Sequence, residues 1–162
     1  MRASCSRHRR RGFTVIELIT VIALMALLTL AVLPRLDVMT SMRGVAWRDQ
    51  VLAALRQAQG VATSHRRLVC VSVATGTVTL TLASANPASS CTLPLPGPDG
   101  DAAWARDAQA PATSVAPAGV LYVQPGGRIT ASGAPDSSAG DRSIAISGET
   151  TIQVVGETGH VE

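Results

Sequence analysis

An apolar run near the N-terminus constrains this chain more than any other feature. From Phe13 to Leu33 the sequence has 21 residues and a single charge, Glu17. A helix rises about 1.5 Å per residue, so this run is about 30 Å long, the thickness of a bilayer's hydrocarbon core. The sequence therefore predicts one membrane-spanning helix over residues 13–34. The rest of the 162-residue chain is long enough for one small globular domain.

The basic residues are concentrated ahead of this run. Five of the 14 cationic residues, all of them Arg, lie among the first 11 positions. The positive-inside rule then places the N-terminus in the cytoplasm and the globular domain outside. Without residues 1–12 the chain has nine Arg and eleven acidic residues, a net charge of −2. This argues against nucleic acid as a partner of the domain, because phosphate contacts need clustered cations.

A specific motif lies where the basic segment meets the apolar run. Residues 11–18 read Arg-Gly-Phe-Thr-Val-Ile-Glu-Leu. This resembles the class III signal of type IV pilins and type II secretion pseudopilins, in which a prepilin peptidase cuts after the Gly and methylates the new N-terminus. The resemblance implies a leader over residues 1–12, cleavage between Gly12 and Phe13, and N-methylation of Phe13. An ordinary secretory signal fits poorly, because its apolar core is 7–15 residues long.

Two further residues match positions of that family. After cleavage Glu17 is the fifth residue, where the family carries the acid that pairs with a neighbouring subunit's N-terminal amine during assembly. Ionisable side chains in membrane helices are costly and usually mark function, although Glu17 could instead reach the interface and pair with nothing. Pro34 occupies a position where many members have a helix-kinking proline. Proline removes a backbone donor, so we expect a bend there, or else a simple helix end at the membrane surface.

The helix is predicted to continue outside the membrane over residues 35–64. Five apolar residues recur there at spacings of three and four: Trp47, Val51, Leu55, Ala58 and Ala62. This amphipathic stripe must pack on another element. We therefore expect one long helix from about residue 13 to residue 64, bent at Pro34 or Gly44.

Residues 65–162 are predicted to form a small antiparallel sheet of about six short strands. Residues 77–82 alternate strictly between polar and apolar, and a short turn separates them from the β-rich residues 68–73. Further β-rich runs cover residues 120–123, 128–131, 144–146 and 151–155, and a last turn over residues 156–159 leads into residues 160–162. No helix separates the runs, which favours antiparallel pairing and an α+β fold. Residues 84–118 and 132–143 are rich in small and turn-forming residues and are predicted to be surface loops, the first long enough to be functional.

The region where the long helix is followed by the first strands indicates a particular branch of this family. Residues 52–73, together with the closing strands, resemble the GspH/FimT branch of the family, although Gln59 stands where members commonly carry Arg. The resemblance implies a type IV pilin-like fold, in which the long helix packs on the sheet. It also implies a single-pass protein of the bacterial inner membrane with its C-terminal domain in the periplasm. Its partners would be the prepilin peptidase, other major and minor pseudopilins or pilins, and inner membrane lipid.

Two cysteines remain once Cys5 is lost with the leader. Cys70 and Cys91 form an even pair in a domain predicted to face the oxidising periplasm. A disulfide between them would stabilise the domain by about 3 kcal/mol in the chain-entropy model and tie the long loop to the first strand. Two unpaired thiols are the alternative, because the geometry cannot be deduced from the sequence.

We find no pattern of residues that indicates catalysis, a cofactor or a metal. The sequence lacks a Gly-x-Ser-x-Gly elbow, a P-loop and paired-Cys zinc spacing, and His65 and His160 are isolated. The chain is therefore predicted not to be an enzyme. The acidic residues of one loop (Asp99, Asp101 and Asp107) are weak calcium candidates, and Arg66-Arg67 is a weak candidate for DNA or lipid. Both groups are more simply explained as solvated surface.

Three functions remain open. The first is a minor pseudopilin of the type II secretion system, a structural subunit of the periplasmic pseudopilus. The second is a minor type IV pilin, similar to FimT or FimU, which primes a surface pilus. The third is a FimT-like pilin that captures DNA, which the net charge of −2 disfavours. The sequence decides little between the first two, and we favour the first.

Overall fold

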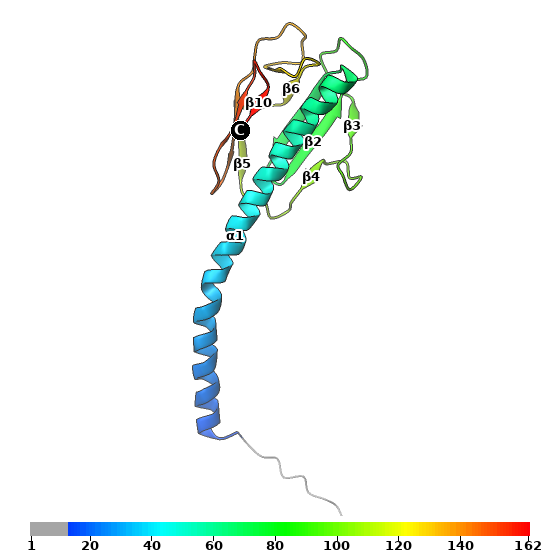
Figure 1. Cartoon of the computed structure of the whole chain (residues 1–162). Coiled ribbons are helices and arrows are strands. Elements are labelled where there is room, and N and C mark those ends of the chain that lie inside the picture. The colour runs from blue at the N-terminus through cyan, green and yellow to red at the C-terminus, as the bar shows by residue number, and fades with distance from the viewer. Residues whose placement is uncertain (1–12) are drawn as a thin grey trace, which may run out of the picture. The chain divides into compact units, whose positions relative to one another are not determined.

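The computed structural model describes residues 13–162, except for the side chains of residues 30–41. The predicted leader, residues 1–12, lies outside the described residues. The chain divides into two compact units, Met1–Met39 and Thr40–Glu162, which we call the N-terminal unit and the globular unit. One helix, α1 (Val15–His65), supplies the regular structure of the first unit and the first element of the second (Figure 1). The predicted long helix is thereby confirmed.

Two predictions about this helix concern the membrane and a kink. Among the described residues, no helix combines the length and the apolar character that crossing a bilayer requires. The predicted span over residues 13–34 is therefore not confirmed and stays a prediction. Pro34, where the kink is expected, lies outside the described side chains.

The C-terminal part of α1 packs on the strands through one apolar stripe. The predicted residues Trp47, Val51, Leu55, Ala58 and Ala62 are all buried in a single core. Figure 1 shows these last turns of α1 lying across the strands. The Trp47 indole is also satisfied, because its Nε1 donates to Thr113 Oγ1 over 2.9 Å.

Six strands form the first sheet. They are β1 (Val69–Ala74), β2 (Thr77–Leu82), β3 (Leu93–Leu95), β4 (Ala105–Arg106), β6 (Leu121–Val123) and β7 (Ile129–Thr130). The order is β3-β2-β1-β6-β7, with β4 on β2, and every pairing is antiparallel as predicted. In β2 the alternation buries Val78, Leu80 and Leu82 in the core shared with α1.

Four strands form a second antiparallel sheet. These are β5 (Thr113–Ala116), β8 (Arg142–Ile146), β9 (Ile152–Val155) and β10 (His160–Val161), in the order β10-β9-β8-β5. The prediction of a single sheet is therefore wrong. The prediction that residues 84–118 form one surface loop is also wrong, because β3, β4 and β5 lie there. These strands have two to four residues, too few for a periodic pattern to mark them.

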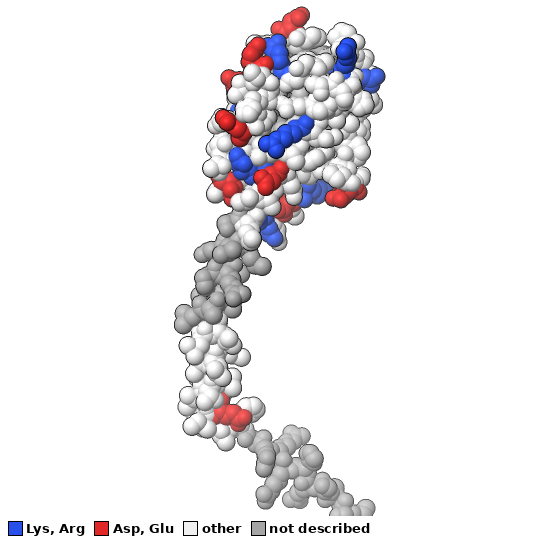
Figure 2. All heavy atoms as spheres, in the orientation of Figure 1, with Lys and Arg blue, Asp and Glu red and all other residues white. Residues whose placement is uncertain are grey.

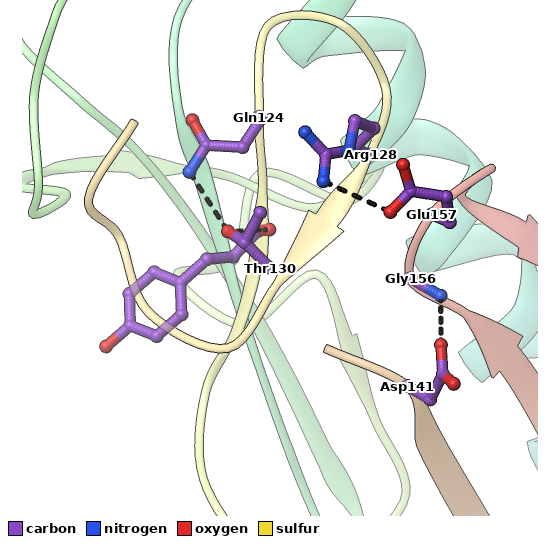
Figure 3. Close-up of polar contacts among 7 residues, drawn as sticks. Gln124, Arg128, Thr130, Asp141, Gly156 and Glu157 are labelled. Atoms are coloured by element: carbon purple, nitrogen blue, oxygen red, sulfur yellow. Dashed lines mark hydrogen bonds and ion pairs between the residues drawn. The ribbon is translucent and has the colours of Figure 1, made fainter. Parts of the chain in front are cut away.

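Backbone hydrogen bonds join the two sheets at β7. Ile129 N donates to Gly156 O over 2.8 Å, and Gly140 N donates to Ile129 O over 2.9 Å. Gly156 N donates in turn to Asp141 Oδ1 over 2.7 Å (Figure 3). The two sheets thus share a hydrogen-bonded seam at which three separate segments meet.

A buried hydroxyl and an exposed ion pair flank this seam. Thr130 is fully buried, and its Oγ1 donates to Ser132 O over 2.7 Å and accepts from Gln124 Nε2 over 3.0 Å. Arg128 Nη2 and Glu157 Oε2 form an ion pair of 3.1 Å (Figure 3). Because that pair is exposed, we expect it to contribute little to stability, and the buried threonine to matter more.

Candidate processing and assembly site

The predicted processing residues lie at the start of α1. Gly12 is outside the described residues, whereas Phe13 and Thr14 precede the first helical residue and the Phe13 side chain is 78 % exposed. Thr14 is the N-cap of the helix. Its Oγ1 accepts a hydrogen bond from Glu17 N over 3.3 Å, and its carbonyl accepts one from Leu18 N over 3.1 Å. The backbone next to the expected cleavage point is therefore non-helical, and a side chain defines where the helix begins.

Glu17 lies in the first turn of this helix, three residues after the cap. Unpaired N–H groups and the helix dipole favour a negative charge in this turn. Thr20 Oγ1 donates to the Glu17 carbonyl over 2.8 Å, so threonines lie three residues before and after the glutamate. No ion pair within the described part of the chain involves the Glu17 carboxylate.

The surface around Glu17 is apolar and uncovered. All eleven large apolar side chains between residues 13 and 29 are exposed. They are Phe13, Val15, Ile16, Leu18, Ile19, Val21, Ile22, Leu24, Met25, Leu27 and Leu28. Contiguous apolar surface of this kind marks contact with lipid or protein.

Sequence reasoning missed the role of Thr14. Residues 14–17, Thr-Val-Ile-Glu, fit the S/T-x-x-E pattern of a capping box, in which the first residue caps the helix and the fourth lies in its first turn. This helix-start signal lies inside the peptidase motif, and the resemblance to that motif does not by itself indicate a cap.

In the globular unit the two remaining cysteines are joined. The Sγ atoms of Cys70 on β1 and Cys91 form a disulfide, and the Cα atoms are 6.0 Å apart. The bond ties the segment between β2 and β3 to the sheet. It belongs to a second, smaller core around Leu68 and Ala83. A hollow of about 250 Å³ beside it is lined by hydroxyl-bearing and apolar residues without a charged side chain.

The acidic loop does not gather into a metal site. No group of three or more His, Cys, Asp or Glu side chains in the described residues could hold a metal ion. Asp99 and Asp101 line one shallow hollow. Asp107 instead accepts a hydrogen bond at Oδ1 from Gln109 N over 2.9 Å. This local contact shapes the turn before β5.

The Arg66-Arg67 pair lies at the C-terminal end of α1. Arg66 has a positive φ of 51°, and Arg67 N donates to Ala62 O over 3.2 Å. This hydrogen bond and the left-handed residue end the helix in a Schellman-type cap. On the face shown in Figure 2, arginines and acids are interspersed over the globular unit without a continuous basic patch. This face has the charge pattern of a solvated surface rather than of a phosphate-binding one.

Comparison with known proteins agrees with the motif at the start of α1. Residues 7–33 match the family model described as the prokaryotic N-terminal methylation motif. This motif indicates the class III signal of type IV pilin-like and pseudopilin proteins, which are structural and membrane-anchored. It implies processing by a prepilin peptidase and assembly with other pilins. No curated protein and no solved structure matches the chain.

Proposed function

We propose that the protein is a minor pseudopilin of the type II secretion system, of the GspH/FimT kind. It is cut between Gly12 and Phe13, methylated at Phe13, and held in the inner membrane by residues 13–34. It then joins the periplasmic pseudopilus as a structural subunit. The observation that carries this proposal is the methylation motif over residues 7–33. The motif overlaps the start of α1, where the large apolar side chains up to residue 29 are all exposed.

The exposed apolar surface explains why such a subunit needs two environments. A helix with many exposed Ile, Leu and Val side chains is unstable in water, because burying one such side chain contributes about 1.5–3 kcal/mol of stability. Lipid covers the surface before assembly, and neighbouring helices cover it in a filament. Glu17 is the one charge in this surface, and the methylated amine of Phe13 in an adjacent subunit would neutralise it.

The globular unit supports a periplasmic location. Structural disulfides persist in oxidising compartments, and Cys70 and Cys91 are bonded in this unit. The same features fit a minor type IV pilin, which shares the processing step and the membrane helix. The interspersed charges of the globular unit favour contacts with protein subunits over capture of DNA.

The processing step can be tested by mass spectrometry of the protein extracted from membranes. We expect the mature chain to begin with N-methylated Phe13. Gly12→Asp should leave the leader attached, because a side chain then blocks close approach of the peptidase to the backbone. Ser6→Asp adds the same charge to the leader away from the junction and should be processed normally. An intact leader in the wild type would contradict the proposal.

A deletion strain distinguishes the two filament systems. Loss of the protein should leave exoproteins in the periplasm while surface pili still form. Complementation with the wild-type chain should restore secretion, and complementation with Gly12→Asp should not. Loss of pili with normal secretion would instead assign the protein to the type IV pilus system.

A further inference from the structure

We propose that a hollow beside β4, which we call the Trp104 hollow, binds a neutral saccharide. A sugar ring stacks on the indole there, and its hydroxyls bond to the surrounding polar side chains. The hollow has a volume of about 290 Å³ and is lined by α1, by the loop over residues 97–104 and by β4. Its aromatic and hydrogen-bonding side chains are those of Gln50, Asp99, Asp101, Trp104 and Arg106. Such a site goes beyond a structural role in a filament.

The backbone of the loop holds this hollow in shape. Gly97 N donates to Asp101 O over 2.9 Å, which closes one end of the loop on itself. At the other end Trp104 N donates to Val78 O over 2.8 Å, next to the pairing of β4 with β2. A Cβ at Gly97 would lie 2.7 Å from the carbonyl oxygens of Ala103 and Trp104, so these segments pack closely. A ligand therefore meets a site that is already formed and does not have to order the loop.

Trp104 supplies the apolar surface on which a ring can stack. Its side chain is half-buried and packs against the main core, and it also lines the hollow. Contact with the core holds the indole in place, and an aromatic ring offers a large contact area at a low cost in conformational entropy. A pyranose ring has a matching flat face of C–H groups, because most of its hydroxyls project from the ring edge.

The charges around Trp104 have both signs and exclude a ligand of strong single charge. The Asp99 and Asp101 carboxylates accept hydrogen bonds, whereas the Arg106 guanidinium donates them. Within the described part of the chain, none of these three side chains forms an ion pair. A cation would be repelled by the guanidinium and an anion by the two carboxylates. A hydroxyl both donates and accepts, so a neutral polyhydroxylated ring can bond to all three, and to the Gln50 amide.

Tryptophan fluorescence of the full-length protein tests this proposal directly. The probe is N,N′-diacetylchitobiose, a neutral disaccharide, and the protein is kept in a detergent without a sugar headgroup. Because Trp47 is buried in the core, a change in emission reports on Trp104. We expect a saturable shift to shorter wavelength whose midpoint is the same at low and at high salt, since salt screens only interactions between charges. Sorbitol has hydroxyls but no ring face and should cause no saturable shift.

Substitutions measured by calorimetry locate the binding in this hollow. Trp104→Phe keeps an aromatic face and should weaken binding about threefold, whereas Trp104→Ala should weaken it roughly tenfold. Asp101→Ala should also weaken binding at least about tenfold, because it removes a hydrogen bond to a charged group. Asp101 is exposed, so this variant tests the site even if Trp104→Ala does not fold. Asp136→Ala removes an exposed aspartate from another loop and is the matched control, which should bind like the wild type.

Several results would overturn the proposal. One is the absence of a saturable response of the wild type to the disaccharide, and another is an equal response to sorbitol. Binding that weakens as salt rises, or equal binding of the zwitterion glycylglycine, would show that the hollow recognises charge instead. Equal affinities of Asp101→Ala and Asp136→Ala would place the disaccharide elsewhere on the protein. Salt-independent binding that Asp101→Ala weakens and Asp136→Ala leaves unchanged is the result that supports it.

Discussion

Gly156 and Gly60 illustrate opposite reasons for a glycine in this protein. A Cβ at Gly156 would lie 2.5 Å from the nitrogen of Gly140 and 2.7 Å from the carbonyl oxygen of Ile129. These are backbone atoms of the seam between the sheets and cannot rotate away. A Cβ at Gly60, inside α1, meets nothing within 4 Å. The first glycine is required by packing, whereas the second only weakens the helix.

The two alanine substitutions should therefore change stability in opposite directions. We expect Gly156→Ala to destabilise the globular unit by about 1–3 kcal/mol through overpacking. Gly60→Ala should stabilise it by about 0.5–1 kcal/mol, because alanine is the better helix former. Urea unfolding followed by circular dichroism measures both. Equal effects of the two changes would show that the seam can open to accept a methyl group.

For individual residues, some side-chain positions could be predicted from the sequence and others could not. The apolar stripe of α1 was correctly identified as core, because it depends on a local period. By contrast, the sequence marks Gln59 only as a departure from the family that the chain resembles. In the structure its Nε2 donates to the carbonyl of Gly159, 100 residues along the chain. Such a contact depends on tertiary arrangement, and no local pattern indicates it.

At the scale of elements, the segment between β2 and β3 depends on its crosslink. Residues 83–92 have no strand of their own and are held by the disulfide between Cys70 and Cys91, which are 21 positions apart. They add only a small apolar cluster to the sheet. In the chain-entropy model a loop of this length is worth about 3 kcal/mol of stability when crosslinked.

Removing the crosslink should release this segment. For the double variant Cys70→Ala with Cys91→Ala we expect a loss of about 3 kcal/mol in the free energy of unfolding. Thiol labelling of the mature wild type without reductant should find no free cysteine. As a control, reductant should lower the stability of the wild type and leave the double variant unchanged. Full labelling of both cysteines in membranes would contradict an oxidised pair.

Strand prediction succeeded where the pattern was local and long. The bounds of β2 were predicted correctly, since six residues alternate strictly. Strands β4 and β5 were missed because their partners, β2 and β8, lie far along the chain and because they have only two and four residues. The division into two sheets was missed for the same reason. It depends on which short strands meet, and the sequence does not encode that choice in any single segment.

For the whole molecule, the distribution of the core indicates which part can fold by itself. Among the side chains that the structure describes, the first core residue along the chain is Trp47, and both described clusters lie within the globular unit. In the N-terminal unit, by contrast, every large apolar side chain described is exposed. The globular unit therefore has what independent folding requires, whereas the N-terminal unit exposes the apolar surface that the proposed anchoring and assembly would use.

A chain shortened to residues 40–162 should accordingly fold without its N-terminal unit. We expect one cooperative urea transition, followed by tryptophan fluorescence, because Trp47 is buried. Its free energy of unfolding should lie within about 0.5 kcal/mol of that of the full-length protein, since every residue of the described core is kept. A chain beginning at residue 53 is the matched control, because it also loses Trp47, Val51 and Leu52 from the core. Each of these buried side chains is worth several kcal/mol when deleted, so this shorter chain should be largely unfolded. If residues 40–162 failed to fold in an oxidising buffer while the full-length chain folded in detergent, the N-terminal unit would be part of the folding unit rather than only its anchor.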